Sequence, residues 1–317
     1  MIEFSWLALS AIITVTAVFL YRKADLKKRW AIGIDINKKA KPEVCEGTGI
    51  AVLFGLVLVL GIYDFVSKSN GTLFALIALA CVFAVLGFVD DTKQKFNSKP
   101  LSWAAKTLPA IIAALAFAFA FAPSMIWVIP TALFVAGLAG LQNTFAGLNG
   151  WQAGSGLIIA VATAFLLNGS WLFVPALILC GAILGFLFWN AYPARALEGD
   201  SGTLLIGAAI AGLLVLSGRK ELLLLGFLFF VPHLIDFFAL KLLTNRRDMT
   251  QSKFRPYKVL MDGRLGIPDY PDGKTRYDFA KLVIRVFGPM KEWKISAIIW
   301  TIVAINALFW LFVFGKI

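Results

Sequence analysis

The sequence predicts an all-α polytopic membrane protein with about ten transmembrane helices and both termini outside. Of its 317 residues, 60% are hydrophobic and only 15% are charged, whereas soluble domains are closer to half apolar and a quarter charged. The apolar residues also come in long runs, and about 20 of them suffice for one helix to cross the hydrocarbon core. The basic residues, in contrast, gather in alternate loops between these runs.

Ten apolar runs are candidate spans. They are 4–21, 50–66, 72–89, 107–122, 125–141, 154–167, 171–190, 203–216, 222–243 and 295–314. Small polar residues extend the short sixth run back to Trp151 and the short eighth run back to Ser201. The first run has no basic region before it and no cleavage site after it, so we expect an uncleaved anchor rather than a signal peptide.

The distribution of basic residues orients the predicted helices. With ten spans, one set of loops comprises 22–47, 90–106, 143–154, 190–202 and 244–294. With Lys241 at its border, this set holds all but four of the 30 Lys and Arg residues; the exceptions are Lys68, Arg219, Lys220 and Lys316. The positive-inside rule then places this set in the cytoplasm. Orientation therefore accounts for the net charge of +12, with anionic lipids or phosphate-bearing substrates as partners and no nucleic acid.

The chain is expected to form a single integral membrane domain over residues 1–317. Its longest cytoplasmic loop, 244–294, begins with basic side chains that suit either phosphate groups or the headgroup surface. Later in this loop, the stretch 277–287 sets Phe279, Leu282, Val283 and Val286 against Lys281 and Arg285. That pattern is typical of an amphipathic helix lying in the membrane interface.

Two adjacent carboxylates, Asp90 and Asp91, end the third apolar run. A helix C-terminus disfavours negative charge because its carbonyl groups are already partly negative. The pair is therefore understandable if a cation or a basic side chain lies nearby, and Lys106 follows at the head of the next run. The alternative is a solvated helix end.

Two further loop segments carry candidates. Asn143 and Asn149 lie in a glycine-rich segment without basic residues, and their amides can supply oxygen ligands or read a base edge. Asp200 lies in a Gly-Asp-Ser-Gly stretch directly before the eighth run. It is either a plain N-cap of the next helix or a metal ligand, and the two roles do not exclude each other.

Within the predicted spans, His233 and Asp236 are the ionisable residues that clearly lie inside a helix. Intramembrane charges are functional candidates by default. Three positions apart, the two side chains share one helix face, so we favour a structural pair between them. The alternative is a transporter that uses them as a site at the bilayer midplane.

Taken together, these stretches resemble the polyprenyl-phosphate N-acetylhexosamine-1-phosphate transferases of glycosyltransferase 4 type. The resemblance is strongest to the branch that makes the first dolichol-linked sugar, in archaeal-like form. The matching motifs are DINK at 35–38, KPE at 41–43, GFVDD at 87–91, KTLP at 106–109, NTFAGLNGWQAG at 143–154, NAYP at 190–193, GDS at 199–201 and VFGPMKE at 286–292. They occur in family order on the predicted cytoplasmic face.

The resemblance implies a catalytic centre and a metal site. By position, Asp200 and Asn143 match the residues that hold Mg²⁺, with Mn²⁺ as an alternative. Lys106 matches the lysine that contacts phosphate. Asp90 and Asp91 match the acidic pair near the lipid-phosphate acceptor, and whether an aspartate removes a proton there is left open.

The resemblance also implies substrate-binding residues. Asn149 matches the asparagine that reads uracil. The other residues marked as substrate-binding are Asp35, Asn37, Lys38, Asn190, Lys253 and Arg255. The family's basic motif in the last cytoplasmic loop contains a histidine, which is absent from the matching stretch 253–256, so a histidine base is excluded there.

The implied reaction moves N-acetylglucosamine 1-phosphate from UDP-GlcNAc to a polyprenyl or dolichyl phosphate and releases UMP, as the first step of lipid-linked oligosaccharide synthesis for N-glycosylation. The implied partners are these two substrates and membrane lipids, with a homodimer left open. The C-terminus lacks an endoplasmic-reticulum retrieval signal. With the compact loops, this favours a prokaryotic, archaeal plasma membrane with the site on its cytoplasmic face.

Overall fold

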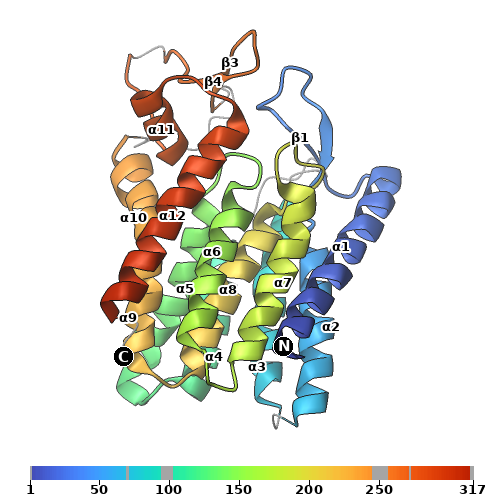
Figure 1. Ribbon diagram of the computed structural model, residues 1–317, viewed down its shortest axis with the longest axis vertical. Coiled ribbons are helices and arrows are strands. Elements are labelled where there is room, and N and C mark those ends of the chain that lie inside the picture. The colour runs from blue at the N-terminus through green and yellow to red at the C-terminus, as the bar shows by residue number, and fades with distance from the viewer. Residues whose placement is uncertain (1, 69–70, 94–102, 245–255, 271–272, 315–317) are drawn as a thin grey trace.

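The computed structural model describes residues 2–68, 71–93, 103–244, 256–270 and 273–314. Long helices run side by side along the molecule, and short strands gather with one small helix at one end (Figure 1). The long helices are α1 (Ile2–Lys28), α2 (Gly49–Ser67), α3 (Thr72–Lys93), α4 (Trp103–Phe121), α5 (Val128–Thr144), α6 (Trp151–Leu166), α7 (Phe173–Asn190), α8 (Gly199–Leu216) and α12 (Glu292–Phe314).

Eight helices in the described part of the chain are long and apolar enough to cross a membrane: α1, α2, α3, α4, α5, α7, α8 and α12. Helix α9 (Lys220–Phe229) is followed at a 56° bend by α10 (Val231–Leu234) and the π-helix η2 (Ile235–Leu242), and this bent pair corresponds to the predicted span 222–243. Helix α6 is apolar but shorter. The all-α polytopic class is confirmed, and the number ten stays a prediction because it requires both the bent pair and α6 to be spans.

Helix α8 forms the centre of the bundle and packs chiefly against α3 and α5. Small residues allow this close packing, as is common between helices in a membrane. At Gly49, where α2 begins, an added Cβ would lie only 2.0 Å from the backbone nitrogen of Gly202 in α8. The start of α8 is thereby fixed directly beside the start of α2.

Alternate loops form a cap at one end of the bundle, namely those between α1 and α2, α5 and α6, and α7 and α8, with the described part of the loop between η2 and α12 (Figure 1). This cap contains two antiparallel hairpins, β1 (Ile32–Ile34) with β2 (Glu43–Cys45) and β3 (Lys258–Val259) with β4 (Leu265–Gly266). The short 3₁₀ helix η1 (Met125–Trp127) precedes α5 instead. Helix α1 begins and α12 ends in the lower half of Figure 1, away from the cap. The pattern of basic residues predicted that both ends of the chain lie away from the basic loops, and the structure agrees in this respect. The side of the membrane that the cap faces stays a prediction.

The amphipathic stretch forms α11 (Phe279–Phe287), and its apolar face packs on the protein. Phe279, Val283 and Ile284 are buried, whereas Val286 and Phe287 are exposed. Lys281, expected on the polar face, is buried as well, and its ammonium lies 2.8 Å from the Asp278 carboxylate. Only the last turn of α11 therefore presents apolar side chains outward.

The predicted pairing of His233 with Asp236 is wrong. The His233 ring is fully buried between Phe145 and Phe230, with ring centroids 3.9 and 4.7 Å away. Asp236 instead accepts a hydrogen bond from the backbone N–H of Phe279 at 2.7 Å and lies 2.7 Å from the Lys241 ammonium. The free N–H groups at the start of α11 need an acceptor, and the carboxylate supplies one. This packing gives no support to a midplane transport site.

Candidate active site

Three charged side chains from three helices meet below the cap. Asp90 comes from the last turns of α3, Lys106 from the first turn of α4 and Asp200 from the first turn of α8. The Lys106 ammonium lies 3.1 Å from Asp200 Oδ2 and also forms an ion pair with Asp90. Asp90 is only 1% exposed, and a buried carboxylate without a cation would be strongly destabilising. The solvated helix end is therefore wrong, and Lys106 is the predicted basic partner.

Asp91, the other member of the acidic pair, holds the start of α8. Its two carboxylate oxygens accept hydrogen bonds from the backbone N–H groups of Asp200 at 2.8 Å and Ser201 at 3.1 Å. Gly199, in the left-handed conformation at φ +65°, leaves room for the carboxylate, because an added Cβ would lie 2.3 Å from Asp91 Oδ2. The N-cap position itself is occupied by Glu198. Asp200 is thus not the N-cap, and its carboxylate forms an ion pair with Lys106 instead.

Asn143 lies beside this charged cluster, near the end of α5. Its side-chain oxygen accepts a hydrogen bond from the Thr203 hydroxyl at 2.8 Å, one turn along α8 from Asp200. Its backbone carbonyl accepts a hydrogen bond from the Gln152 side chain at 3.0 Å. Asn143 and Asp200 line the same cavity, together with Lys106.

That cavity is large and mostly apolar, with a volume of about 1230 Å³. Its lining runs from Asn143 near the end of α5 to Trp127 just before the start of α5, so it follows the helix along the bundle. Aromatic side chains contribute much of its wall, namely Phe83, Phe134, Phe227, Phe237 and Phe238. The charged cluster therefore forms the polar end of the cavity nearest the cap, and Lys220 lines the cavity at the opposite end.

A second polar cluster lies in the cap and joins the β1–β2 hairpin to the glycine-rich segment. Asp35 Oδ2 accepts a hydrogen bond from the Asn149 side-chain NH₂ at 3.0 Å, and Asp35 Oδ1 accepts one from the Asn37 backbone N–H at 3.1 Å. The Lys38 ammonium lies 3.1 Å from Asp35 and also pairs with Glu292. Glu292 in turn accepts a hydrogen bond from the Asn149 backbone N–H at 2.8 Å. Asp35, Asn37, Lys38 and Asn149 were each expected to bind substrate, and the structure brings them together around Glu292.

Glu292 is the member of this cluster that sequence reasoning missed as a site residue. It is 2% exposed at the first turn of α12, far along the chain from Lys38 and Asn149. An acidic residue in a first helical turn is ordinary, so composition alone gave no signal. The signal that could have found it is the motif VFGPMKE at 286–292, of which Glu292 is the last residue.

Asn190 has a local role in the described structure. Its NH₂ group donates to the Ala196 carbonyl at 3.0 Å and to Glu198 Oε2 at 2.6 Å, closing the loop between α7 and α8. Burial raises the pKa of the Glu198 carboxyl to about 7. Lys253 and Arg255, expected to bind pyrophosphate, lie outside the described residues.

The oxygen donors near Lys106 suit a hard divalent cation. Mg²⁺ is commonly held by one or two carboxylates, with substrate phosphates and waters completing the shell. Asp200 and Asn143 offer such oxygens. The Lys106 ammonium lies between Asp90 and Asp200, so the two carboxylates already stabilise a positive charge there. Among the described residues no group of three or more His, Cys, Asp or Glu side chains could hold a metal. The donors thus fit a cation shared with substrate rather than an all-protein site.

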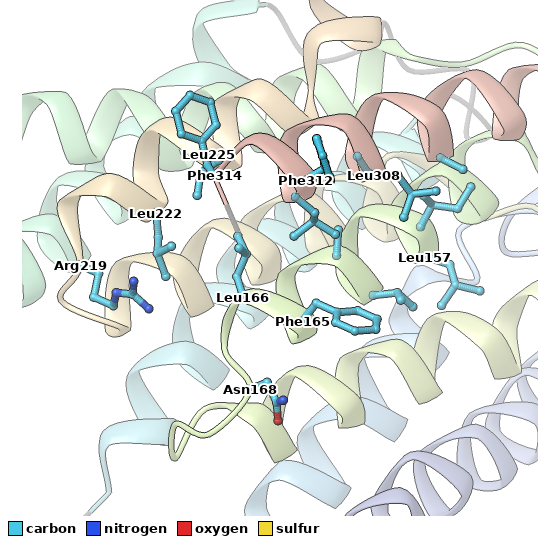
Figure 2. A pocket seen from close by; sticks show the side chains of 16 residues that line it. Leu157, Phe165, Leu166, Asn168, Arg219, Leu222, Leu225, Leu308, Phe312 and Phe314 are labelled. Carbon is cyan, nitrogen blue, oxygen red and sulfur yellow. The ribbon is translucent and has the colours of Figure 1, made fainter. Parts of the chain in front are cut away.

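Another groove, of about 940 Å³, lies between α6, α9 and α12 (Figure 2). Its labelled side chains include Leu166, Arg219 and Phe314, from the end of α6, just before the start of α9 and the end of α12. These positions are at the end of the bundle opposite the cap. None of the predicted site residues lines this groove.

Comparison with known proteins places this architecture in a family. Residues 73–218 match glycosyl transferase family 4. A putative glycosyltransferase of Methanocaldococcus jannaschii is 31% identical over 86% of this chain and 84% of its own length. A putative UDP-N-acetylglucosamine–dolichyl-phosphate N-acetylglucosaminephosphotransferase of Sulfolobus acidocaldarius is 29% identical over 89% and 87%.

Bacterial relatives share a smaller part of the chain. A phospho-N-acetylmuramoyl-pentapeptide-transferase of Carboxydothermus hydrogenoformans is 30% identical over 58% of this chain and 66% of its own length. The family match over residues 73–218 covers the helices that carry Asp90, Lys106, Asn143 and Asp200. The chain therefore belongs to glycosyl transferase family 4 and is a membrane-embedded glycosyl-1-phosphate transferase.

Proposed function

We propose that the protein transfers N-acetylglucosamine 1-phosphate from UDP-GlcNAc to a polyprenyl phosphate of the dolichyl type and releases UMP, beginning a lipid-linked oligosaccharide for N-glycosylation. The observation that carries this proposal is the charged cluster of Asp90, Lys106 and Asp200 at the polar end of the apolar cavity. A polyprenyl phosphate has the same two parts, a long apolar chain and one charged end. The names of the archaeal relatives support the sugar and the lipid.

The reaction exchanges one phosphorus–oxygen bond for another. An oxygen of the lipid phosphate attacks the β-phosphorus of UDP-GlcNAc and forms the new pyrophosphate bond. The bond from the β-phosphorus to the oxygen bridging the two phosphates breaks, and that oxygen leaves with UMP and the electron pair. A phosphate monoester has a second pKa of about 6, so near neutral pH the attacking oxygen is already deprotonated and a general base is not obligatory.

The main physical obstacle is the meeting of two polyanions. In a site shielded from water, preorganised positive charge stabilises the negative charge that gathers during transfer. Lys106 would contact the phosphates from the mouth of the cavity, and Asp90, beneath it, would hold the ammonium in place. Asp91 would act indirectly, because its hydrogen bonds fix the turn that carries Asp200.

Asp200 and Asn143 are the residues that would hold Mg²⁺, which supplies charge neutralisation to the substrate phosphates when bound. The second polar cluster would take the nucleotide, with Asn149 reading uracil. Lys253 and Arg255 would contact the pyrophosphate. We further propose that the cap faces the cytoplasm of an archaeal cell, since the basic loops gather there.

UMP release tests the proposal directly. The detergent-solubilised protein is incubated with UDP-GlcNAc and Mg²⁺, with and without dolichyl phosphate, and UMP is measured. We expect UMP only when the lipid phosphate is present. UDP-N-acetylmuramoyl-pentapeptide with undecaprenyl phosphate serves as the competing pair, since bacterial relatives carry that transferase name. UMP release from the competing pair alone would overturn the proposed donor, and release without any lipid would overturn the proposed acceptor.

A further inference from the structure

The amide of Asn149 is held in one orientation by Asp35. Its NH₂ group donates to Asp35 Oδ2 at 3.0 Å. A carboxylate only accepts hydrogen bonds, so the nitrogen of the amide must face Asp35 and the oxygen must face away. Asp35 itself is anchored by the Asn37 backbone N–H and by the Lys38 ammonium, and it is 5% exposed.

The amide of the neighbouring Asn37 side chain is also held in one orientation by an acceptor. Its NH₂ group donates to the Gly147 carbonyl at 3.0 Å, and a carbonyl is also only an acceptor. The side-chain oxygen of Asn37 is buried and receives no hydrogen bond from any described residue. A buried acceptor left without a donor is costly, so this oxygen is a second candidate acceptor for an N–H group of a ligand. Asn37 and Asn149 thus both offer oxygens, and Asp35 contacts both residues.

We propose that Asp35 is a positioning residue that sets the base specificity of the enzyme. Because Asp35 binds the side-chain NH₂ group of Asn149, only the side-chain oxygen of Asn149 is available to the nucleotide base, as a hydrogen-bond acceptor. This inference rests on the proposed function, in which Asn149 contacts the base of a nucleoside-diphosphate sugar. Between uracil and cytosine, the base selected is then the one with a ring N–H, which is uracil.

The two pyrimidines differ at the position that such an acceptor would meet. Uracil carries a hydrogen on N3, whereas N3 of cytosine is a bare acceptor. A freely turning amide can serve either base, because one end donates and the other accepts. An amide held by a carboxylate serves only uracil, and cytosine would place two acceptors against each other. Each well-placed base contact discriminates by a factor of about 10 to 100.

Binding of UDP and CDP to the full-length detergent-solubilised protein tests this role. Isothermal titration gives a dissociation constant for each nucleotide, and their ratio is the readout. We expect the wild type to prefer UDP by about 10- to 100-fold. In Asp35→Asn the replaced side chain can both donate and accept, so the Asn149 amide is free to turn and the preference should fall toward unity. The control Glu43→Gln removes an exposed carboxylate of the same hairpin, paired with Arg29, and should keep the wild-type ratio.

A double variant provides the rescue. Asp35→Asn combined with Asn149→Asp exchanges the two groups, keeping their hydrogen bond and net charge while leaving an obligate acceptor toward the base. It should regain the preference for UDP, and this expectation stands even where Asp35→Asn alone fails to fold. A double variant that binds both nucleotides equally, or an Asp35→Asn protein with the wild-type ratio, would overturn the inference. A wild type that binds neither nucleotide would instead overturn the proposed function, and one that binds both equally would overturn the inference alone.

Discussion

The ammonium of Lys106 lies 3.1 Å from Asp200 Oδ2 and contacts the Asp90 carboxylate on its other side. One lysine therefore connects the end of α3 to the start of α8, at the polar end of the apolar cavity. Because the lysine neutralises a buried carboxylate and also lines the cavity, the proposed function gives it a catalytic role beside its structural one. The two can be separated by substitution.

Lys106→Met should lower both stability and turnover, because it removes the ammonium that pairs with the buried Asp90 carboxylate. Breaking a buried ion pair typically costs about 3–5 kcal/mol. Lys106 is 35% exposed on its side chain, so we expect a smaller loss of about 1–3 kcal/mol in the free energy of unfolding. The double variant Lys106→Met with Asp90→Asn should recover stability but not turnover. Recovery of both, measured by thermal unfolding and UMP release, would show that Lys106 has only a structural role.

Asp91→Ala should destabilise the start of α8 and reduce turnover in proportion. The change removes two hydrogen bonds from the backbone N–H groups of Asp200 and Ser201, and charge-assisted bonds contribute about 1.5–3 kcal/mol each. Asp91→Asn retains one acceptor and should recover part of both properties. Thermal unfolding and UMP release are measured on the same preparations. A fully stable Asp91→Ala protein without activity would point to a direct chemical role for Asp91 instead.

The Glu198 carboxyl should make stability depend on pH. Burial raises its pKa from about 4.5 to about 7, outweighing the hydrogen bond from Asn190. Between these values the folded state binds the proton more tightly than the unfolded state, so the free energy of unfolding falls as pH rises through this window and then levels off. The fall amounts to at most about 3 kcal/mol.

Glu198→Gln should remove this component of the pH dependence. Melting temperatures are compared at about pH 5 and pH 8, with the exposed Glu221→Gln as the matched control. A fall in the melting temperature that is equally large in wild type and Glu198→Gln would assign the effect to another group.

Asn149→Ala should weaken binding of the nucleotide sugar more than it lowers turnover at saturation. The side chain is held against Asp35 in the cap, while the charged cluster at Lys106 is held by separate contacts. Loss of one base contact costs about 1–3 kcal/mol, which should appear in KM for UDP-GlcNAc. An unchanged KM with a reduced kcat would assign Asn149 to the chemical step.

Much of the architecture could be predicted from the sequence because apolar runs and basic loops report directly on the bilayer. The sequence also predicted a cation or basic side chain near Asp90, because a helix C-terminus disfavours negative charge. Lys106 is that basic side chain. The sequence could not predict that Asp90 pairs with Lys106 while Asp91 binds the backbone of α8, because these contacts depend on how closely α8 approaches α3. At Gly87 an added Cβ would lie 2.3 Å from the Asp200 backbone.

Contacts between distant segments were the main source of error. His233 and Asp236 share a helix, which favoured a local pair, but η2 turns Asp236 toward the free N–H of Phe279 instead. Glu292 joins Lys38 and Asn149 across most of the chain. Nothing in the sequence near Glu292 indicates these partners, so tertiary packing alone selects them.

The most direct test of the central claim is the Mg²⁺ dependence of Asp200→Asn. This substitution keeps the shape and the backbone N–H that Asp91 binds, but removes the charge at the cavity. We predict a protein that folds as wild type, loses most of its sugar-phosphate transfer from UDP-GlcNAc to dolichyl phosphate, and requires more Mg²⁺ for the remainder. The control Glu221→Gln, at the far end of the bundle, should match wild type. Near-wild-type turnover of Asp200→Asn at unchanged Mg²⁺ dependence would contradict the account and move the metal site to Asp90.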